Sequence, residues 1–147
     1  MTILLDLDGP LIPLTSWKQP DILDDNFPNF KQEAVEALNH IIKETNANIL
    51  LTSSHKDNPF LDWISIFNKR GINITEIDKL PTNRLRFTRK IELQEFLKNN
   101  LDHYVIIDDD RTLNSLPENI KSNWVMVSPL IGLTMEGALD AIKILTN

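Results

Sequence analysis

Short apolar runs alternate with longer amphipathic segments along the whole chain, and this alternation constrains the fold more than any other feature. Five runs have the length and composition of β-strands: 2–7, 48–51, 72–77, 104–107 and 124–127. Four segments between or after them carry apolar residues at helical spacing: about 30–45, 60–71, 89–101 and 134–145. Strands separated by helices of this length favour parallel pairing with right-handed crossovers. The pattern predicts one domain, 1–147, with a three-layer α/β/α arrangement.

Composition excludes several kinds of chemistry. The 147 residues contain no cysteine, so disulfides, thiolate metal sites and cysteine nucleophiles are excluded. The three histidines lie far apart, which leaves oxygen ligands for any metal and favours Mg²⁺, Ca²⁺ or Mn²⁺. No run approaches the roughly 18 apolar residues of a membrane span. The expected compartment is therefore the cytoplasm. The net charge of −6 does not indicate that the surface as a whole binds nucleic acid.

Two acids follow the first predicted strand. Alternation along a strand places Asp6 and Asp8 on the same side, where their carboxylates repel each other. A divalent cation would resolve that repulsion. The alternative is a plain turn, because Asp, Gly and Pro are all favoured in turns and 8–10 has that composition.

A second acidic cluster, Asp108-Asp109-Asp110, follows the fully apolar strand 104–107. By itself it is explained as a solvated turn or a helix cap. In a parallel α/β sheet, however, the carboxyl ends of the strands form the ligand-binding edge. Since both acidic clusters are expected at that edge, together they predict a metal site.

Two further segments offer groups that suit a phosphoryl oxygen. Thr52 and Ser53 end the second strand with hydroxyl and backbone donors, although helix capping would use the same groups. Arg89 and Lys90 open an amphipathic segment, and a cation there opposes the helix dipole. Charge balance with a phosphate explains that placement, and a solvated basic residue is the alternative.

Taken in chain order, these segments resemble the motifs of the haloacid dehalogenase (HAD) superfamily. Residues 3–9 match the first motif, 51–54 the second, Arg89 or Lys90 the third and 106–109 the fourth. The resemblance implies a Rossmann-like HAD fold with a parallel sheet of five strands in the order 5-4-1-2-3. More narrowly, 52–56, 89–97 and 104–110 resemble the small HAD domains found with Swiss-army-knife RNA-repair proteins.

The resemblance implies a role for each acid. Asp6 would be the nucleophile that forms an aspartyl-phosphate, and Asp8 would protonate the leaving group and then activate water. Mg²⁺ would be held by the Asp6 carboxylate, the Asp8 backbone carbonyl and Asp109, with Asp108 close by or ligating through water. The expected activity is Mg²⁺-dependent hydrolysis of phosphate monoesters.

Substrate contacts follow from the second and third motifs. Thr52, with Ser53 beside it, and Arg89 would bind the transferring phosphoryl oxygens; Lys90 remains the alternative to Arg89. The sequence departs from the family at Pro10, which lacks a backbone N–H donor, and at His55, where close relatives often carry tryptophan.

The connections between the predicted elements are too short for a cap domain. An open site suits large substrates such as polynucleotide ends or phosphoproteins, or an oligomer that supplies a lid. The segment 79–90 carries three arginines and two lysines close to the expected site. Trp17 and Phe27 in the first loop either anchor that loop, which is the preferred interpretation, or stack on a base.

Three other classes of protein were compared with this pattern. A response-regulator receiver carries its acidic pair early and its lone aspartate later, which is the reverse of the order here. A nucleotide-binding Rossmann domain requires a glycine-rich phosphate loop, and this chain has four glycines and no such motif. A non-catalytic HAD-like module that binds phosphate or nucleic acid remains the alternative to a phosphatase, although it would have no use for Asp6 and Asp8 together.

Overall fold

A parallel β-sheet forms the centre of the molecule. The computed structural model describes residues 1–14, 19–99 and 101–147. Its strands are β1 (Thr2–Leu5), β2 (Asn48–Leu51), β3 (Asp78–Lys79), β4 (Tyr104–Asp108) and β5 (Trp124–Met126). All four strand pairs are parallel, and the order across the sheet is β3-β2-β1-β4-β5. This is the predicted order read from the opposite edge, so the α/β class and the sheet topology are confirmed.

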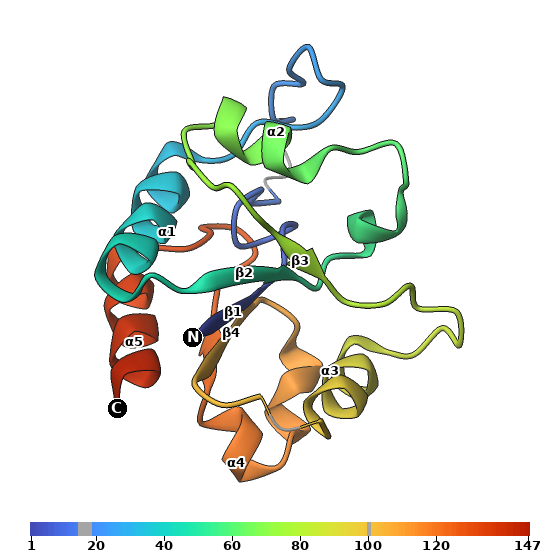
Figure 1. Cartoon of the computed structure of the whole chain (residues 1–147), viewed down its shortest axis with the longest axis vertical. Helices are drawn as coiled ribbons and strands as arrows, with labels where there is room; N and C mark the ends of the chain where they lie inside the picture. Colours follow the sequence, from blue (N-terminus) through green and yellow to red (C-terminus); the bar gives the residue numbers. More distant parts are fainter. Residues whose placement is uncertain (15–18, 100) are drawn as a thin grey trace.

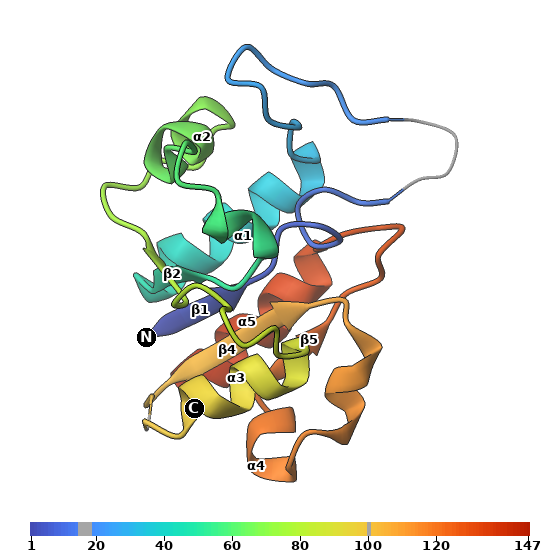
Figure 2. The ribbon, with the colours of Figure 1, turned by 90° about the vertical axis from the view of Figure 1, so that its right-hand side faces the viewer.

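Helices cover both faces of the sheet. They are α1 (Gln32–Thr45), α2 (Trp63–Lys69), α3 (Arg89–Leu97), α4 (Glu118–Lys121) and α5 (Met135–Thr146), with two 3₁₀ turns, η1 (Ser54–Asp57) and η2 (Arg111–Ser115). Figures 1 and 2 show α1 and α5 together on one face and α3 and α4 on the other. Among the described residues, the segments between β1 and α1 and between β3 and α3 form no additional helical layer.

The alternation of side chains along β1 accounts for the two-sided core. Ile3 and Leu5 join the cluster beneath α1, α2 and α5, whereas Leu4 joins the cluster beneath α3 and η2. All three side chains are fully buried. Each contributes roughly 1.5–3 kcal/mol to stability through burial. This burial on both faces explains why the apolar run forms the central strand.

The third strand was predicted in the wrong place. The alternating stretch 72–77 is not a strand, and β3 consists of Asp78 and Lys79 instead. Ile72 donates its backbone N–H to Phe67 at the end of α2, and Ile74 donates to the Asn68 side chain. These bonds tie the segment to α2, so its apolar side chains fill the core without joining the sheet.

Two predicted helix boundaries also differ from those observed. Phe60 is 93% exposed and lies before α2, because the Asp62 side chain accepts a hydrogen bond from Ser65 N–H and caps the helix there. Helix α3 ends at Leu97, so Leu101 lies beyond it, although Leu101 still packs against the core.

The long first loop is fastened to α2 by a buried arginine. The Arg70 guanidinium makes two hydrogen bonds to the Asp25 carboxylate, at 2.7 and 2.9 Å, and donates to the Phe27 and Pro28 carbonyls. Phe27 is buried and its ring lies edge-on to Trp63. Phe27 therefore anchors the loop and is not free to stack on a base. The other aromatic residue considered for stacking, Trp17, lies outside the described residues.

No helix in the described ranges is long and apolar enough to cross a membrane.

Candidate active site

Acidic side chains from β1 and β4 meet at the carboxyl edge of the sheet. The parallel register pairs Leu5 with Ile107, so Asp6 and Asp108 follow at the same level. The Asp6 backbone N–H donates to the Ile107 carbonyl at 3.1 Å and fixes that level. Carboxylate oxygens of Asp6, Asp108 and Asp109 lie within 4.8 Å of one another. The two predicted acidic clusters thus converge on one small volume.

Burial makes these carboxylates difficult to ionise. Asp6 is 6% exposed and Asp108 is 1% exposed. Desolvation, reinforced by the Asp108 carboxylate, raises the pKa of Asp6 to about 8 although Arg89 opposes the shift. Desolvation also raises the pKa of Asp108, to about 6, against the effect of Arg89, and it raises the pKa of Asp109. The protein itself therefore supplies too little positive charge for the cluster.

The donor set fits a hard divalent cation. When ionised, three carboxylates facing one arginine leave two uncompensated negative charges, which one divalent ion neutralises. The Oδ2 atom of Asp108 is buried and has no hydrogen-bond partner among the described residues. Arg89 lies 3.5 Å from this oxygen as an ion pair without a hydrogen bond, and a buried carboxylate oxygen that accepts no hydrogen bond is costly. The acidic cluster could therefore bind a metal, and oxygen ligands favour Mg²⁺ or Mn²⁺.

Gly9 makes room for one of the acids. Its φ is +100°, and a Cβ at this position would lie 2.5 Å from both Cγ and Oδ2 of Asp109. Any side chain would therefore collide with that carboxylate, in addition to straining the backbone. The glycine is part of the acidic site as well as part of a turn.

Arg89 provides the cation of the site. Arg89 is the first residue of α3, and nitrogen atoms of its guanidinium lie 3.5 Å from Asp6 Oδ1 and 3.5 Å from Asp108 Oδ2. It also donates to the Thr52 carbonyl at 2.7 Å, which fixes its orientation. Lys90 forms no ion pair with any residue in the described ranges and does not line the acidic cavity. Of the two predicted cations, the structure brings only Arg89 to the acids.

Thr52 and Ser53 are both buried at the end of β2, but they differ in hydrogen bonding. Ser53 Oγ accepts a hydrogen bond from His55 N–H at 3.2 Å and caps η1, which is the capping alternative considered from the sequence. The Thr52 hydroxyl has no partner in the part of the chain that the structure describes. Of the two hydroxyls, that of Thr52 is therefore the one without a hydrogen bond among the described residues, although it is buried.

Asp8 does not join the three-acid cluster through its carboxylate. Its Oδ2 lies 3.0 Å from Nε2 of His55, and both side chains are partly exposed. The His55 ring lies edge-on to the buried ring of Phe27, with centroids 5.2 Å apart. The imidazole is therefore held from behind and keeps the Asp8 carboxylate in one orientation.

The acids and Arg89 line an open cavity of about 290 Å³. Thr52, Ser53 and His55 are not among the residues that line it. Its walls include Asp6, Asp8, Arg89 and Asp109. The cavity is therefore lined by acids and one guanidinium, a composition suited to a metal ion and a phosphoryl group together.

The parallel sheet and the acids at its carboxyl edge define a HAD-type α/β domain. The comparison with protein families agrees: residues 2–138 match the family described as "HAD domain in Swiss Army Knife RNA repair proteins". The chain belongs to that family. Comparisons with curated proteins and with solved structures gave no match.

Sequence reasoning missed two features of the site. The contact between His55 and Asp8 joins two motifs that lie far apart in the chain, and the only signal was a histidine directly after the predicted phosphate-binding segment. The role of Gly9 was hidden because a glycine after Asp8 is already explained by a turn.

Proposed function

We propose that this protein is a Mg²⁺-dependent phosphohydrolase that cleaves phosphate monoesters through an aspartyl-phosphate on Asp6. The observation that carries the proposal is the meeting of Asp6, Asp108 and Asp109 around one point, with Arg89 facing them. Buried acids with raised pKa values and one nearby guanidinium are expected where a metal and a phosphate bind together.

Mg²⁺ would be held by the carboxylates of Asp6 and Asp109 and by the backbone carbonyl of Asp8, with Asp108 beside it. When bound, the ion supplies positive charge to the phosphoryl oxygens and keeps Asp6 ionised near neutral pH. Arg89 adds a second positive charge to the same oxygens, and the Thr52 hydroxyl donates a hydrogen bond.

The proposed reaction has two displacements at phosphorus. An Asp6 carboxylate oxygen attacks, the bond between phosphorus and the ester oxygen breaks, and Asp8 donates a proton to the departing oxygen. Asp8, now ionised, takes a proton from a water molecule whose oxygen attacks the same phosphorus. The bond between phosphorus and Asp6 breaks, which releases inorganic phosphate and restores both aspartates.

In this proposal His55 is a positioning residue. Its Nε2 contacts one carboxylate oxygen of Asp8, leaving the other oxygen to exchange the proton. Because proton transfer requires close alignment, an Asp8 side chain that rotated freely would lower the turnover number more than the affinity for substrate.

Two features favour nucleotide or polynucleotide ends as substrates. The family takes its description from RNA-repair proteins. The segment between β3 and α3 carries Arg84 and Arg86, both exposed, although the net charge of the chain is −6. A local basic segment next to an open site suits a polyanionic substrate.

The test is release of inorganic phosphate from an aryl phosphate with Mg²⁺, comparing the native chain with Asp6→Asn and Asp140→Asn. Asp140 is an exposed acid on α5 and serves as the matched control. We expect Asp6→Asn to abolish release and Asp140→Asn to leave it unchanged. Full activity of Asp6→Asn would refute the nucleophile assignment. Phosphate binding without release by the native chain would favour a non-catalytic HAD-like module.

A further inference from the structure

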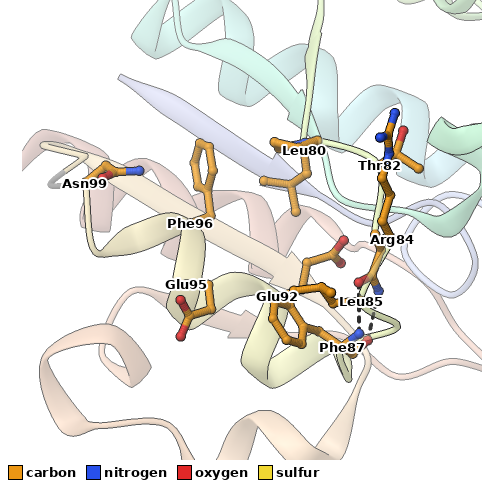
Figure 3. Close-up of a pocket in the computed structure, with 11 residues that line it drawn as sticks. Leu80, Thr82, Arg84, Leu85, Phe87, Glu92, Glu95, Phe96 and Asn99 are labelled. Atoms are coloured by element: carbon orange, nitrogen blue, oxygen red, sulfur yellow. Dashed lines mark hydrogen bonds between the residues drawn. The ribbon is translucent and has the colours of Figure 1, made fainter.

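A second pocket lies beside the acidic site, between the segment after β3 and helix α3. Its volume is about 290 Å³. Figure 3 shows Leu80 and Phe96 at one end of this pocket and Leu85 and Phe87 at the other. The pocket is therefore mainly apolar, with two aromatic rings in its walls.

Between this pocket and the acidic cavity lies an intermediate cavity of about 210 Å³. The intermediate cavity shares Ser54, Arg89 and Asp110 with the acidic site. It shares Asn83, Phe87 and Glu92 with the second pocket. The three cavities are therefore neighbours, which gives a ligand whose phosphate lies near Asp6 a direction in which its remaining part extends towards the pocket.

Two acids that line the second pocket have a basic partner. Glu92 lies 3.1 Å from the ammonium of Lys56, which is 2% exposed, and Glu95 lies 2.7 Å from that of Lys98. Lys56 is shared with Asp57, at 3.6 Å, and Asp110 in the intermediate cavity has no ion pair among the described residues. The basic side chains that face a ligand are Arg84 in the pocket and Arg89 in the other two cavities. Each of these two arginines is placed to contact a phosphate of a polyanion.

The segment over the pocket has a defined shape. The Asn83 side chain donates to the Phe87 carbonyl at 2.8 Å and accepts from the Phe87 N–H at 2.9 Å, as the dashed lines in Figure 3 show. The loop closed by these bonds holds Leu85 at the rim of the pocket with 76% of its surface exposed. Leu85 extends the apolar lining of the pocket to its rim, and an apolar cavity with a few polar groups is typical of ligand-binding sites.

We propose that this pocket binds a nucleobase of a polynucleotide whose terminal phosphate occupies the acidic site. The proposal rests on the proposed hydrolysis only for the position of that phosphate. Aromatic rings stack on any base, and the Asn99 amide in the lining suits the polar edge of a base. The basic segment then follows the sugar-phosphate backbone between the two sites.

A phosphopeptide is the main competing ligand. Its aliphatic or aromatic side chain would also enter an apolar pocket, but it would not gain from flat rings flanked by an amide group. The two ligands therefore differ in whether removal of the base, with the backbone left intact, weakens binding.

The experiment measures binding of short fluorescent RNA oligonucleotides, phosphorylated at the 3′ or the 5′ end, to the Asp6→Asn chain with Mg²⁺. Each is compared with the same oligonucleotide lacking bases at its last two positions, and with a phosphopeptide of similar charge. Binding is read by fluorescence anisotropy, so the result does not depend on turnover.

We expect loss of the two bases to weaken binding roughly 5- to 100-fold for one of the two phosphorylated ends, the range typical of stacking on an aromatic side chain. Phe96→Ala should reduce this preference towards unity. Leu85→Glu should do the same without disturbing the core, because that side chain is largely exposed. Phe60→Ala, which alters a 93% exposed ring outside the pocket, should keep the preference.

Equal affinity for intact and abasic oligonucleotides would overturn the proposal, as would tighter binding of the phosphopeptide. A base preference in a protein that releases no phosphate from any substrate would support the pocket and refute the hydrolase. Release of phosphate from small esters without any base preference would support the hydrolase and refute the base-binding pocket.

Discussion

The raised pKa values of the acidic cluster predict that, without metal, the protein loses stability as the pH rises. The perturbation is a change of pH combined with Asp6→Asn. In the unfolded chain Asp6 has a pKa near 3.8, whereas in the fold its pKa is about 8. Between pH about 4 and about 8, Asp6 therefore holds a proton in the native state that it has released in the unfolded chain. This contribution to stability is complete below the unfolded pKa and is lost as the pH rises towards about 8.

The magnitude follows from linkage. Each pH unit in that interval removes up to about 1.4 kcal/mol per group, so raising the pH from about 5 to about 7 removes up to roughly 3 kcal/mol through Asp6. Asp108, with a folded pKa of about 6, adds a smaller loss in the lower part of the interval. Asparagine does not titrate, so the Asp6→Asn chain should lack the larger part of this dependence.

The assay is urea unfolding of the native chain, Asp6→Asn and Asp140→Asn at the two pH values with a metal chelator present. We expect Asp140→Asn to follow the native chain and Asp6→Asn to show a flatter dependence on pH. Excess Mg²⁺ should stabilise the native chain most at the higher pH. Parallel pH dependences for the native and Asp6→Asn chains would refute the argument that this carboxyl is protonated in the metal-free fold.

Three further substitutions have defined outcomes. Gly9→Ala should weaken Mg²⁺ binding, measured by calorimetry, and lower stability by about 1–3 kcal/mol, because the new Cβ meets the Asp109 carboxylate and the backbone is left-handed. His55→Ala should lower kcat between about 10- and 100-fold with KM little changed, since Asp8 loses its positioning contact, and His55→Asn should restore part of the rate. Arg70→Met should lower the free energy of unfolding by about 1–3 kcal/mol, because the Phe27 and Ile66 carbonyls lose their buried hydrogen-bond donor, whereas the Asp25 carboxylate is partly exposed.

Much of the fold was predictable because its strongest signals are local. The apolar strands that become β1 and β4 each end in acids, and the helix that begins at Arg89 has a threonine cap before it. The third strand was not predictable. Asp78 and Lys79 carry no strand signal and pair with β2 only because the sheet offers an edge there, while the apolar residues of 72–77 are used by the core.

The candidate site was predictable in its acids and less so in its surroundings. Parallel strands must bring Asp6 and Asp108 to one edge, so this convergence follows from topology. The pairing of His55 with Asp8, and the space that Gly9 leaves for Asp109, depend on loops that the sequence pattern does not position. The apolar pocket over α3 was not predicted either. The segment 79–90 was interpreted through its basic residues, and its apolar side chains carry no periodic pattern that indicates a pocket.

The central claim is that Asp6 and Asp109 share one divalent cation. Its most direct test is a crystal structure grown with Mn²⁺, in which anomalous scattering locates the ion independently of the protein. We expect a single Mn²⁺ bonded to carboxylate oxygens of both residues. An ion bound elsewhere would contradict this claim. So would a site without metal, if protein from the same crystals hydrolyses phosphate esters after it is dissolved.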